Sequence, residues 1–560
     1  MNKVLITATP PTSNGDLHVG HLSGPYIAGD VFKRFCQLNG LEAWYVTGGD
    51  DNQSYLPVKS AQLGMTPVEV AQRFNDDITS TLATAQVQLD LYVRPLSSPR
   101  HREFVTEFVR TLWEKGALVE REKDGAWCEH CQCYLYEAHI SGTCSFCGER
   151  ADGNICEACA RPNQAVDLID AKCRHCGGGV TAKPFKRLYF PLAPYAGRLR
   201  EYFSRVGMGS HLAALCEGML ADGLPEIPIS HPVDWGIPVP VPGYENQRIY
   251  AWFEMAPGYL SETQEMLDRE GKGGSWRDVW CSDDAEVVQF FGYDNGYFHA
   301  ILFPAEMMAY DPEIRLPKAF VVNEFYRLDG LKFSTSRNHA IWGREALSFL
   351  PVDALRYFLA YDRPETEQSN FLLDNFRVAV RRELLGRWEP WLLRLGKRVR
   401  EAGGAAPKLG ALTPTQAHFQ EDLRQLIRQA TAGYRAESFS PQRVAATLNE
   451  LVRTAWSFGS GEAFWPASAG EARATALALE LAAARALAVL AAPILPGLAA
   501  RLWSELGLGA APGPGDWPSE PVPVPEGQRI TGMEKPYFEG LEAGLDALQA
   551  SRAKRAEAAA

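Results

Sequence analysis

The chain has 560 residues, a length that favours several domains. Hydrophobic residues make up 46% of it and charged residues 22%, the balance of a globular protein with a large core. The formal net charge of −12 excludes binding to nucleic acid through overall charge, so any such contact must use a local basic face. The first residues form no basic and then apolar leader, and the most apolar stretch, residues 486–500, is shorter than the ~20 residues that a membrane span needs. We therefore expect a cytoplasmic protein that does not enter a membrane.

The first motif is His-Val-Gly-His at residues 18–21. It follows an apolar, strand-like run at 4–6 and a breaker-rich segment at 10–13, and the four-residue apolar spacing from Ile27 to Phe35 predicts a helix behind it. A strand-to-helix junction offers unpaired N–H groups to an anion, imidazoles can donate to phosphate oxygens, and glycine lets a flat ligand approach the backbone. Taken alone, however, the motif is better explained as two surface histidines at a helix cap.

Nine of the 12 cysteines lie between Cys128 and Cys176. Eight of them form four Cys-x-x-Cys pairs, and two such pairs complete a tetrahedral Cys₄ site. In a reducing compartment this pattern indicates metal rather than disulfides. We predict two structural zinc ions, with Cys133 spare, on the ligands Cys128, Cys131, Cys144, Cys147, Cys156, Cys159, Cys173 and Cys176. A stand-alone zinc ribbon that binds nucleic acid is an alternative for this segment, although its acidic neighbours argue against it.

Polar residues follow two further strand-like runs. The run at 43–46 leads to Asp50, and the run at 286–291 leads to Asp294 and His299. Residues just past the carboxyl ends of parallel strands face the ligand side of an open sheet. On spacing alone, a solvated turn explains Asp50 equally well.

A second loop, Gly-Leu-Lys-Phe-Ser-Thr-Ser-Arg at residues 330–337, is small and polar with cations at its edges. Together with residues 18–21 it resembles the two signature loops of class I aminoacyl-tRNA synthetases, usually written His-Ile-Gly-His and Lys-Met-Ser-Lys-Ser. The cysteine pairs and the aromatic segment 250–259 between the loops are similar to those of methionyl-tRNA synthetases in particular. The resemblance implies that both loops hold ATP while an amino acid attacks its α-phosphate.

The same resemblance implies the residues of the site. Catalytic roles fall on His18, His21, Lys332, Ser334, Thr335 and Ser336. ATP, accompanied by Mg²⁺, would contact His18, Gly20, His21, Asp294 and Lys332. The amino acid, its ammonium held by Asp50, would contact Ala8, Thr9, Asp50, Trp252, Tyr259, Asp294, Phe298 and His299. The zinc sites would be nested, with the inner two cysteine pairs on one ion and the outer two on the other.

Three of the departures from the family pattern affect the reaction rate or the amino-acid pocket. Thr335 stands where the family has its second loop lysine, and losing such a preorganised cation typically costs ~10²–10³ in rate unless Lys332 and Arg337 compensate. Thr9 replaces a leucine, and Phe303 replaces a tryptophan that packs on the methionine thioether. A pocket of this kind discriminates by only ~1–3 kcal/mol per methylene, so we expect that methionine is not clearly the best substrate and that a smaller or more polar amino acid supports pyrophosphate exchange as well or better. Divergence that keeps methionine activity is nearly as well supported.

We expect an α/β fold: a class I synthetase Rossmann-like catalytic domain with an inserted zinc-knuckle connective domain and a C-terminal α-helical bundle. The expected parts are catalytic half 1 (1–115), the connective insertion with two zinc knuckles (116–230), catalytic half 2 (231–325), the signature-loop and stem-contact region (326–370), the anticodon-binding-like helical domain (371–540) and a terminal helix (541–560). Residues 234–240 and 249–254 are predicted to be extended.

The region after residue 371 contains a run of eight basic residues between Arg377 and Arg400. A basic helix face is usually only solvated, but here the resemblance implies an anticodon-binding domain in which Arg387 and Trp465 read tRNA. Glu383 replaces an asparagine of the family, and a carboxylate facing RNA would be unfavourable.

The predicted function is ATP-dependent formation of an aminoacyl-adenylate and its transfer to tRNA by a monomeric enzyme. One alternative is a relative that activates a different amino acid and transfers it to a small-molecule acceptor in specialised biosynthesis. Another is a non-catalytic RNA-binding relative. The sequence does not identify the amino acid, the acceptor, the effect of Thr335 on rate or the oligomeric state.

Overall fold

The computed structural model describes residues 2–271, 273–333, 339–462 and 470–559. The chain divides into two compact units. Unit 1 contains residues 1–16, 44–81 and 88–323, and unit 2 contains residues 17–43, 82–87 and 324–560. Each unit is described by itself, and the domain boundaries expected from the sequence stay a prediction.

A five-stranded sheet is the centre of unit 1. Its order is β16-β15-β1-β2-β3, formed by β1 (Lys3–Ala8), β2 (Glu42–Gly48), β3 (Leu91–Val93), β15 (Ala285–Gly292) and β16 (Ala319–Asn323). The pairs β1–β15, β15–β16 and β2–β3 are parallel. β1 is buried from Val4 to Ala8, as expected for a parallel strand covered on both faces. Because β1 lies between β15 and β2, the carboxyl ends of these three strands meet at one edge, and the α/β prediction is confirmed.

Helices of unit 1 cover this sheet and carry part of the site. They are α3 (Tyr55–Leu63), α4 (Pro67–Thr84), α5 (Pro99–Glu114), α6 (Ala196–Phe203), α7 (Ser210–Asp222), α8 (Met255–Arg269), α9 (Arg277–Trp280) and α10 (Phe303–Tyr310). The prediction of an extended segment at 249–254 is wrong over most of its length. After the two-residue strand β14 (Arg248–Ile249), Ala251–Phe253 form a 3₁₀ turn that leads directly into α8. This turn aims the aromatic residues of the segment inward rather than alternately to two faces.

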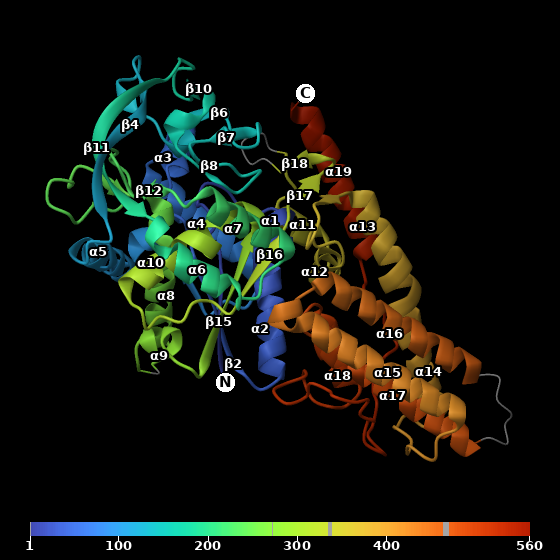
Figure 1. Ribbon diagram of the computed structural model, residues 1–560. Coiled ribbons are helices and arrows are strands. Elements are labelled where there is room, and N and C mark those ends of the chain that lie inside the picture. The colour runs from blue at the N-terminus through green and yellow to red at the C-terminus, as the bar shows by residue number, and fades with distance from the viewer. Residues whose placement is uncertain (1, 272, 334–338, 463–469, 560) are drawn as a thin grey trace. The chain divides into compact units, whose positions relative to one another are not determined.

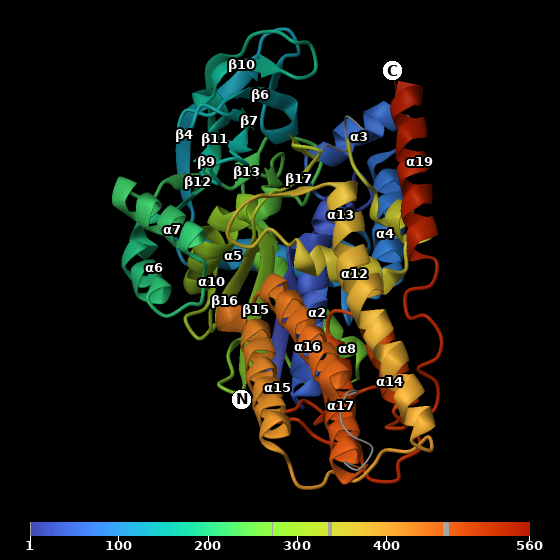
Figure 2. The ribbon, with the colours of Figure 1, turned by 90° about the vertical axis from the view of Figure 1, so that its right-hand side faces the viewer.

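The cysteine-rich insertion forms small antiparallel sheets within unit 1. A long ribbon of β4 (Val119–Cys128) and β11 (Thr181–Pro191) carries it, as Figures 1 and 2 show. β5 (Cys133–Tyr134) and β12 (Glu226–Pro228) flank the ribbon. The inner cysteine pairs lie between β6 (Ile140–Thr143) and β7 (Arg150–Asp152) and between β8 (Asn154–Ile155) and β9 (Pro162–Asn163). The outer pairs lie between β4 and β5 and between β10 (Ile169–Cys173) and β11. A further pair, β13 (Ser230–His231) with β14, follows the insertion.

Unit 2 begins with the histidine motif and ends with a helical bundle. Its early elements are α1 (Val19–His21) and α2 (Ile27–Leu38), joined by a π-helical turn, and the predicted helix behind the motif is confirmed. The sheet β18-β17-β19 and the helices α11 and α12 follow, with bounds β17 (Tyr326–Leu328), β18 (Leu331–Lys332), β19 (Ser369–Phe371), α11 (Gly343–Phe349) and α12 (Val352–Tyr361).

The predicted helical remainder is confirmed. It contains α13 (Leu373–Val380), a π-helical stretch (Arg381–Trp388), α14 (Glu389–Glu401), α15 (Pro414–Tyr434), α16 (Pro441–Glu462), α17 (Gly470–Ala491), α18 (Pro496–Glu505) and the terminal α19 (Leu541–Ala559). Figure 2 shows α14 to α17 lying alongside one another. Within the described residues, α17 is the one helix long and apolar enough to cross a membrane, but 89% of its apolar window is buried inside the fold. A core helix of a bundle passes the same test of length and composition.

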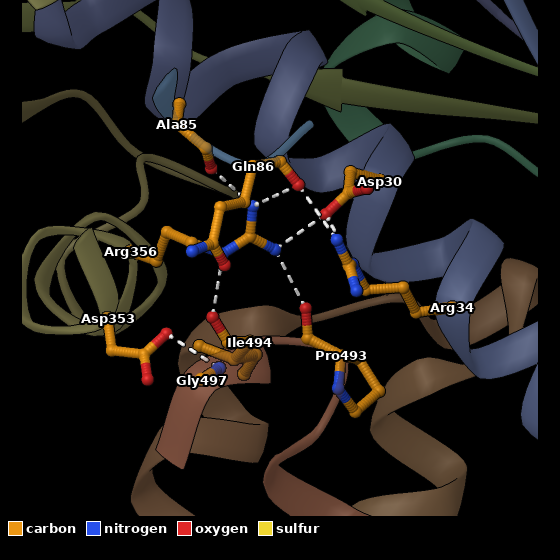
Figure 3. Close-up of polar contacts among 9 residues, drawn as sticks. All are labelled: Asp30, Arg34, Ala85, Gln86, Asp353, Arg356, Pro493, Ile494 and Gly497. Atoms are coloured by element: carbon orange, nitrogen blue, oxygen red, sulfur yellow. Dashed lines mark hydrogen bonds and ion pairs between the residues drawn. The ribbon is translucent and has the colours of Figure 1, made fainter. Parts of the chain in front are cut away.

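A buried ion pair joins distant segments of unit 2 (Figure 3). Arg356 of α12 is fully buried, and its Nη2 donates to Asp30 Oδ2 of α2 at 2.6 Å. The same guanidinium donates to the carbonyls of Ala85, Pro493 and Ile494 at 2.8–2.9 Å. The helix behind the histidine motif is thereby fixed to the start of the 496–505 helix by one side chain.

Candidate active site and metal centres

Asp50 lies just past the end of β2, at the strand edge described above. It is 1% exposed, its N–H donates to the Pro11 carbonyl, and Thr12 Oγ1 donates to its Oδ2 at 3.3 Å. Among the described residues, Asp50 Oδ1 has no hydrogen-bond partner. Burial, followed by the nearby carboxylates of Glu254 and Glu137, holds the pKa of Asp50 well above its usual value. The solvated-turn explanation is therefore wrong, because the carboxyl group is enclosed.

An aromatic cluster forms beside the end of β15. The rings of Trp252 and Phe298 stack at 4.1 Å with an interplanar angle of 4°. Phe303 packs edge-on against His299 at 4.9 Å and against Tyr259 at 6.2 Å. Tyr259, Phe298 and Phe303 are each 1% exposed and belong to the core of unit 1, where they gather around the buried His299.

His299 is held in one tautomer. Its Nδ1 is 3.1 Å from the Asn295 carbonyl and must donate to it, so Nε2 is the acceptor. Tyr259 donates its hydroxyl to Nε2 at 2.9 Å, and Thr9 Oγ1 lies 3.4 Å from the same atom. Burial lowers the pKa of His299 to about 3, so the ring is neutral near pH 7. Thr9, which replaces an apolar residue of the family, has thus become part of a polar group around His299.

Ala8 and Asp294 complete the predicted amino-acid contacts of unit 1. Ala8 ends β1, and its carbonyl accepts from Thr47 Oγ1 at 3.0 Å. Asp294 follows β15 and accepts from Asn295 Nδ2 at 3.1 Å. Burial raises the pKa of Asp294 to about 6. The structure brings these residues to the strand edge where Asp50 lies.

The two histidines of the motif lie in unit 2 and bond to one another. The His21 N–H donates to His18 Nδ1 and the His18 N–H donates to His21 Nδ1, both at 3.3 Å, and the rings stack at 3.7 Å. Burial lowers the pKa of His21 to about 4, and burial together with His21 lowers the pKa of His18 well below its usual value. Both imidazoles are therefore neutral at pH 7, and each can donate one hydrogen bond to a phosphate oxygen.

The second signature loop reaches the first through Phe333. Its ring stacks on His18 at 4.3 Å with an interplanar angle of 10°. A Cβ on Gly20 would lie 3.0 Å from the His18 ring and 3.3 Å from Phe333, so a larger residue here would push these rings aside by a few tenths of an ångström. The His18 backbone also forms an antiparallel bridge with Trp342. Two segments more than 300 residues apart in sequence thus form one structure within unit 2.

Lys332 ends β18, directly before Phe333. The predicted residues Ser334, Thr335 and Ser336 and the anticodon residue Trp465 lie outside the described residues. Their roles stay predictions.

The eight paired cysteines gather into two groups of four in the nested arrangement that the resemblance implies. The outer group is Cys128, Cys131, Cys173 and Cys176, the inner group is Cys144, Cys147, Cys156 and Cys159, and within each group all Sγ atoms lie within 4.8 Å of one another. The closest Sγ–Sγ distances are 3.5–3.9 Å. A tetrahedral zinc with Zn–S bonds of ~2.3 Å requires ~3.8 Å between sulfurs, so both groups fit a structural zinc ion. All the cysteines are free thiols.

Two expectations about the basic run near the start of the bundle need correction. Its arginines are largely matched by carboxylates: Arg381 pairs with Glu542, and Arg394 and Arg398 pair with the buried Glu480. Glu383 does not face RNA, because it is 3% exposed and accepts from Arg387 Nη1 at 2.8 Å. Much of the positive charge of this run is therefore neutralised by ion pairs within the chain. Arg387 remains partly exposed.

The sequence reasoning missed three residues of these sites. Glu254 is fully buried and accepts a hydrogen bond from Asn52 Nδ2 at 2.9 Å. Its carboxylate raises the pKa of Asp50. Glu137 is buried at the same place but comes from the cysteine-rich insertion. Phe333 was visible as the one aromatic residue of a polar loop, whereas nothing in the local sequence of Glu137 marks it.

Comparisons with known proteins agree with this geometry. A family model described as tRNA synthetases class I (M) matches residues 4–395. Methionine–tRNA ligase of Thermomicrobium roseum is 34% identical over 510 residues, covering 89% of this chain and 85% of that protein. Methionine–tRNA ligase of Thermococcus kodakarensis is 31% identical over 529 residues, covering 91% of this chain and 70% of that protein.

A solved structure of Mycobacterium tuberculosis methionyl-tRNA synthetase in complex with methionyl-adenylate matches in fold. Its TM-score is 0.78 at 20% sequence identity, and the match covers 95% of this chain and 99% of that one. Together with the family model and the sequence relatives, the signature loops and the strand-edge acid lead to one assignment. The chain belongs to the methionyl-tRNA synthetase family of class I aminoacyl-tRNA synthetases, which are ligases.

Proposed function

We propose that this enzyme activates methionine with ATP to form methionyl-adenylate and transfers the methionyl group to tRNA. The observation that supports it best is the buried Asp50 carboxyl group at the strand edge, beside the cluster of Trp252, Tyr259, Phe298 and His299. Asp50 offers an unpaired oxygen for an α-ammonium group, and the aromatic rings offer an apolar surface for a thioether. The named relatives do not favour the alternative of a small-molecule acceptor.

In this proposal the residues of unit 1 position the amino acid. Asp50 pairs with its ammonium, which leaves the carboxylate free to attack the α-phosphorus of ATP. The P–O bond to pyrophosphate breaks as the bond to the carboxylate oxygen forms. No proton needs to be removed from the nucleophile, so the rate enhancement comes from positioning and from stabilising charge.

The residues of unit 2 would hold ATP. Neutral His18 and His21 donate hydrogen bonds to phosphate oxygens, Gly20 lets the nucleotide lie close to the backbone, and Lys332 adds a positive charge. Mg²⁺, carried in with ATP, would supply further charge neutralisation when bound. Thr335 lacks the charge of the family's lysine, so we expect slower adenylate formation than in relatives that keep it.

The metal and RNA partners are part of the same proposal. Each cysteine group would hold one structural zinc ion that stabilises the insertion and takes no part in the chemistry. Arg387 and Trp465 would contact the tRNA anticodon, and the enzyme would act as a monomer.

Pyrophosphate exchange with each of the twenty amino acids tests the activation step. We expect methionine to give the highest exchange rate. In a second assay, we expect the enzyme to charge bulk tRNA with methionine. Exchange that is faster with another amino acid would refute the methionine assignment and support the altered pocket that Thr9 and Phe303 suggest. Exchange with methionine but no charging of tRNA would favour the small-molecule acceptor, and no exchange at all would favour a non-catalytic relative.

A further inference from the structure

The cysteine-rich insertion contributes a buried carboxylate, Glu137, that is bonded to Ser54, four residues after Asp50. Glu137 stands in a short 3₁₀ turn (Glu137–His139) between strands β5 and β6, and it is 4% exposed. Its φ of +40° lies in the left-handed region, which non-glycine residues adopt at a cost. A Cβ on Gly153 would come within 2.9 Å of the Glu137 backbone nitrogen, so the turn is also tightly enclosed. An acidic side chain is therefore kept in a strained and buried turn.

The turn is fixed to the segment that carries Asp50. Ser54 Oγ donates to Glu137 Oε2 at 2.8 Å and accepts from the Ala138 N–H at 3.2 Å. A second link lies close by in sequence, where Tyr55 donates to Asp152 of β7 at 2.9 Å. Ser54 is the fourth residue after Asp50, and every residue from 50 to 54 is buried. The insertion thus contacts the segment that carries Asp50 through the Glu137 carboxylate, which Ser54 holds in a defined position.

The same turn is attached to the outer cysteine group. The Arg174 N–H, between Cys173 and Cys176, donates to the His139 carbonyl at 2.9 Å. The rings of His175 and His139 are joined at 2.8 Å. A continuous series of contacts therefore runs from the outer metal knuckle through the turn to Ser54 and the Asp50 segment.

We propose that Glu137 is a positioning residue for the amino-acid ammonium: held by Ser54 and by the outer metal knuckle, it strengthens the negative field in which Asp50 binds the substrate. The unpaired Oδ1 of the buried Asp50 is the point at which the ligand is needed. The inference deepens the proposed function and rests on it, since the ligand is the α-ammonium of the amino acid to be activated. If Glu137 acts in this way, the insertion contributes to the affinity for the amino acid.

The charge of Glu137 depends on pH in the relevant range. Burial raises the pKa of Glu137 to about 7, partly offset by hydrogen bonds from Ser54 and others. The titratable groups that interact electrostatically with Glu137 are Asp50, Tyr55, Tyr136 and Tyr250. One step further away, Glu254 acts on Asp50, and Asp152 and Arg174 act on Tyr55. The ionised fraction of Glu137 in the free enzyme therefore rises between pH 6 and pH 8. Only the ionised form adds to the attraction for an ammonium group.

The test is the dissociation constant of methionine, measured by calorimetry without ATP between pH 6 and pH 8 on the full chain. Glu137→Gln should weaken binding roughly ten-fold at pH 8, the effect of about one pKa unit, and change it little at pH 6. Ser54→Ala keeps the Glu137 carboxylate but removes the hydroxyl group that donates to it. This variant should lose less methionine affinity than Glu137→Gln, with the same pH trend. Asp170→Asn is the matched control, because Asp170 lies on the same insertion with φ of +52° but is exposed.

A loss that is the same at pH 6 and pH 8 would show a structural role only and would overturn the inference, as would unchanged affinity at both values. Asp170→Asn should bind like the unaltered enzyme at both pH values, and a similar pH-dependent loss there would also contradict the proposal. If the unaltered enzyme fails to bind methionine at any pH, the proposed function fails instead, so the two failures are distinguishable.

Discussion

Replacing Arg356 with methionine should destabilise unit 2 strongly. Methionine fills much of the volume of the arginine stem but removes the guanidinium that is paired with Asp30 and bonded to three carbonyl oxygens. Breaking a fully buried ion pair by removing one partner costs about 3–5 kcal/mol when the remaining charge is left unpaired. Asp30 keeps its bond from Arg34 at 2.8 Å, so we expect a cost at the lower end of that range. Carbonyls left without a donor add to this loss. The expected total is a large part of the ~5–15 kcal/mol that holds a typical domain folded.

The assay is urea unfolding followed by circular dichroism, with Arg34→Met as the control. Arg34 also pairs with Asp30, at 2.8 Å, but its side chain is 14% exposed, so its loss should cost only about 1 kcal/mol. The double variant Asp30→Asn with Arg356→Met should be more stable than the sum of the two single losses predicts, because it leaves no buried charge behind. A loss below about 1 kcal/mol for Arg356→Met, or strict additivity, would refute the view that this pair holds α2 and α12 together.

Three further predictions concern the nucleotide site, the metal sites and pH. His21→Ala should reduce adenylate formation in single-turnover assays far more than ATP affinity, since charge develops on the phosphates in the transition state; equal losses would place His21 in ground-state binding. Cys144→Ser should halve the zinc content found by metal analysis and loosen the insertion to proteolysis, while fully retained zinc would contradict the inner Cys₄ site. Burial raises the pKa of Glu262 to about 8, so the folded state keeps a proton that the unfolded state releases above about 4.5, and stability should fall as pH rises between these values. Glu262→Gln should flatten that dependence in thermal unfolding at pH 6 and pH 8, and an unchanged slope would exclude Glu262 as its source.

Some features of this protein follow from local sequence alone. The four Cys-x-x-Cys pairs determine which thiols can bind the same metal ion from one turn, because two cysteines three residues apart lie in one tight loop. Apolar spacing and breakers determine the helix after the histidine motif and the helices beyond residue 371, since periodicity reports directly which face is buried. The signature loops are recognisable because ATP binding requires these residue types in this order.

Other features exist only in the folded chain. Asp50 is enclosed because β1 lies between β2 and β15, a strand order that local spacing does not encode. Trp252 points into the cluster because its segment turns as a 3₁₀ helix rather than extending, which depends on packing against its neighbours.

Charge was the property least accessible from sequence. The basic run of the bundle looks like an RNA-binding face, yet Glu480 and Glu542, far along the chain, neutralise part of it once the helices pack. Glu137 looks like an ordinary acidic residue, yet its turn carries it to Ser54, 83 positions earlier. Sequence thus determined which chemical groups are available and which local elements carry them. Tertiary structure decided which groups are buried, paired or left in need of a ligand, because burial and pairing depend on contacts between segments that are distant along the chain.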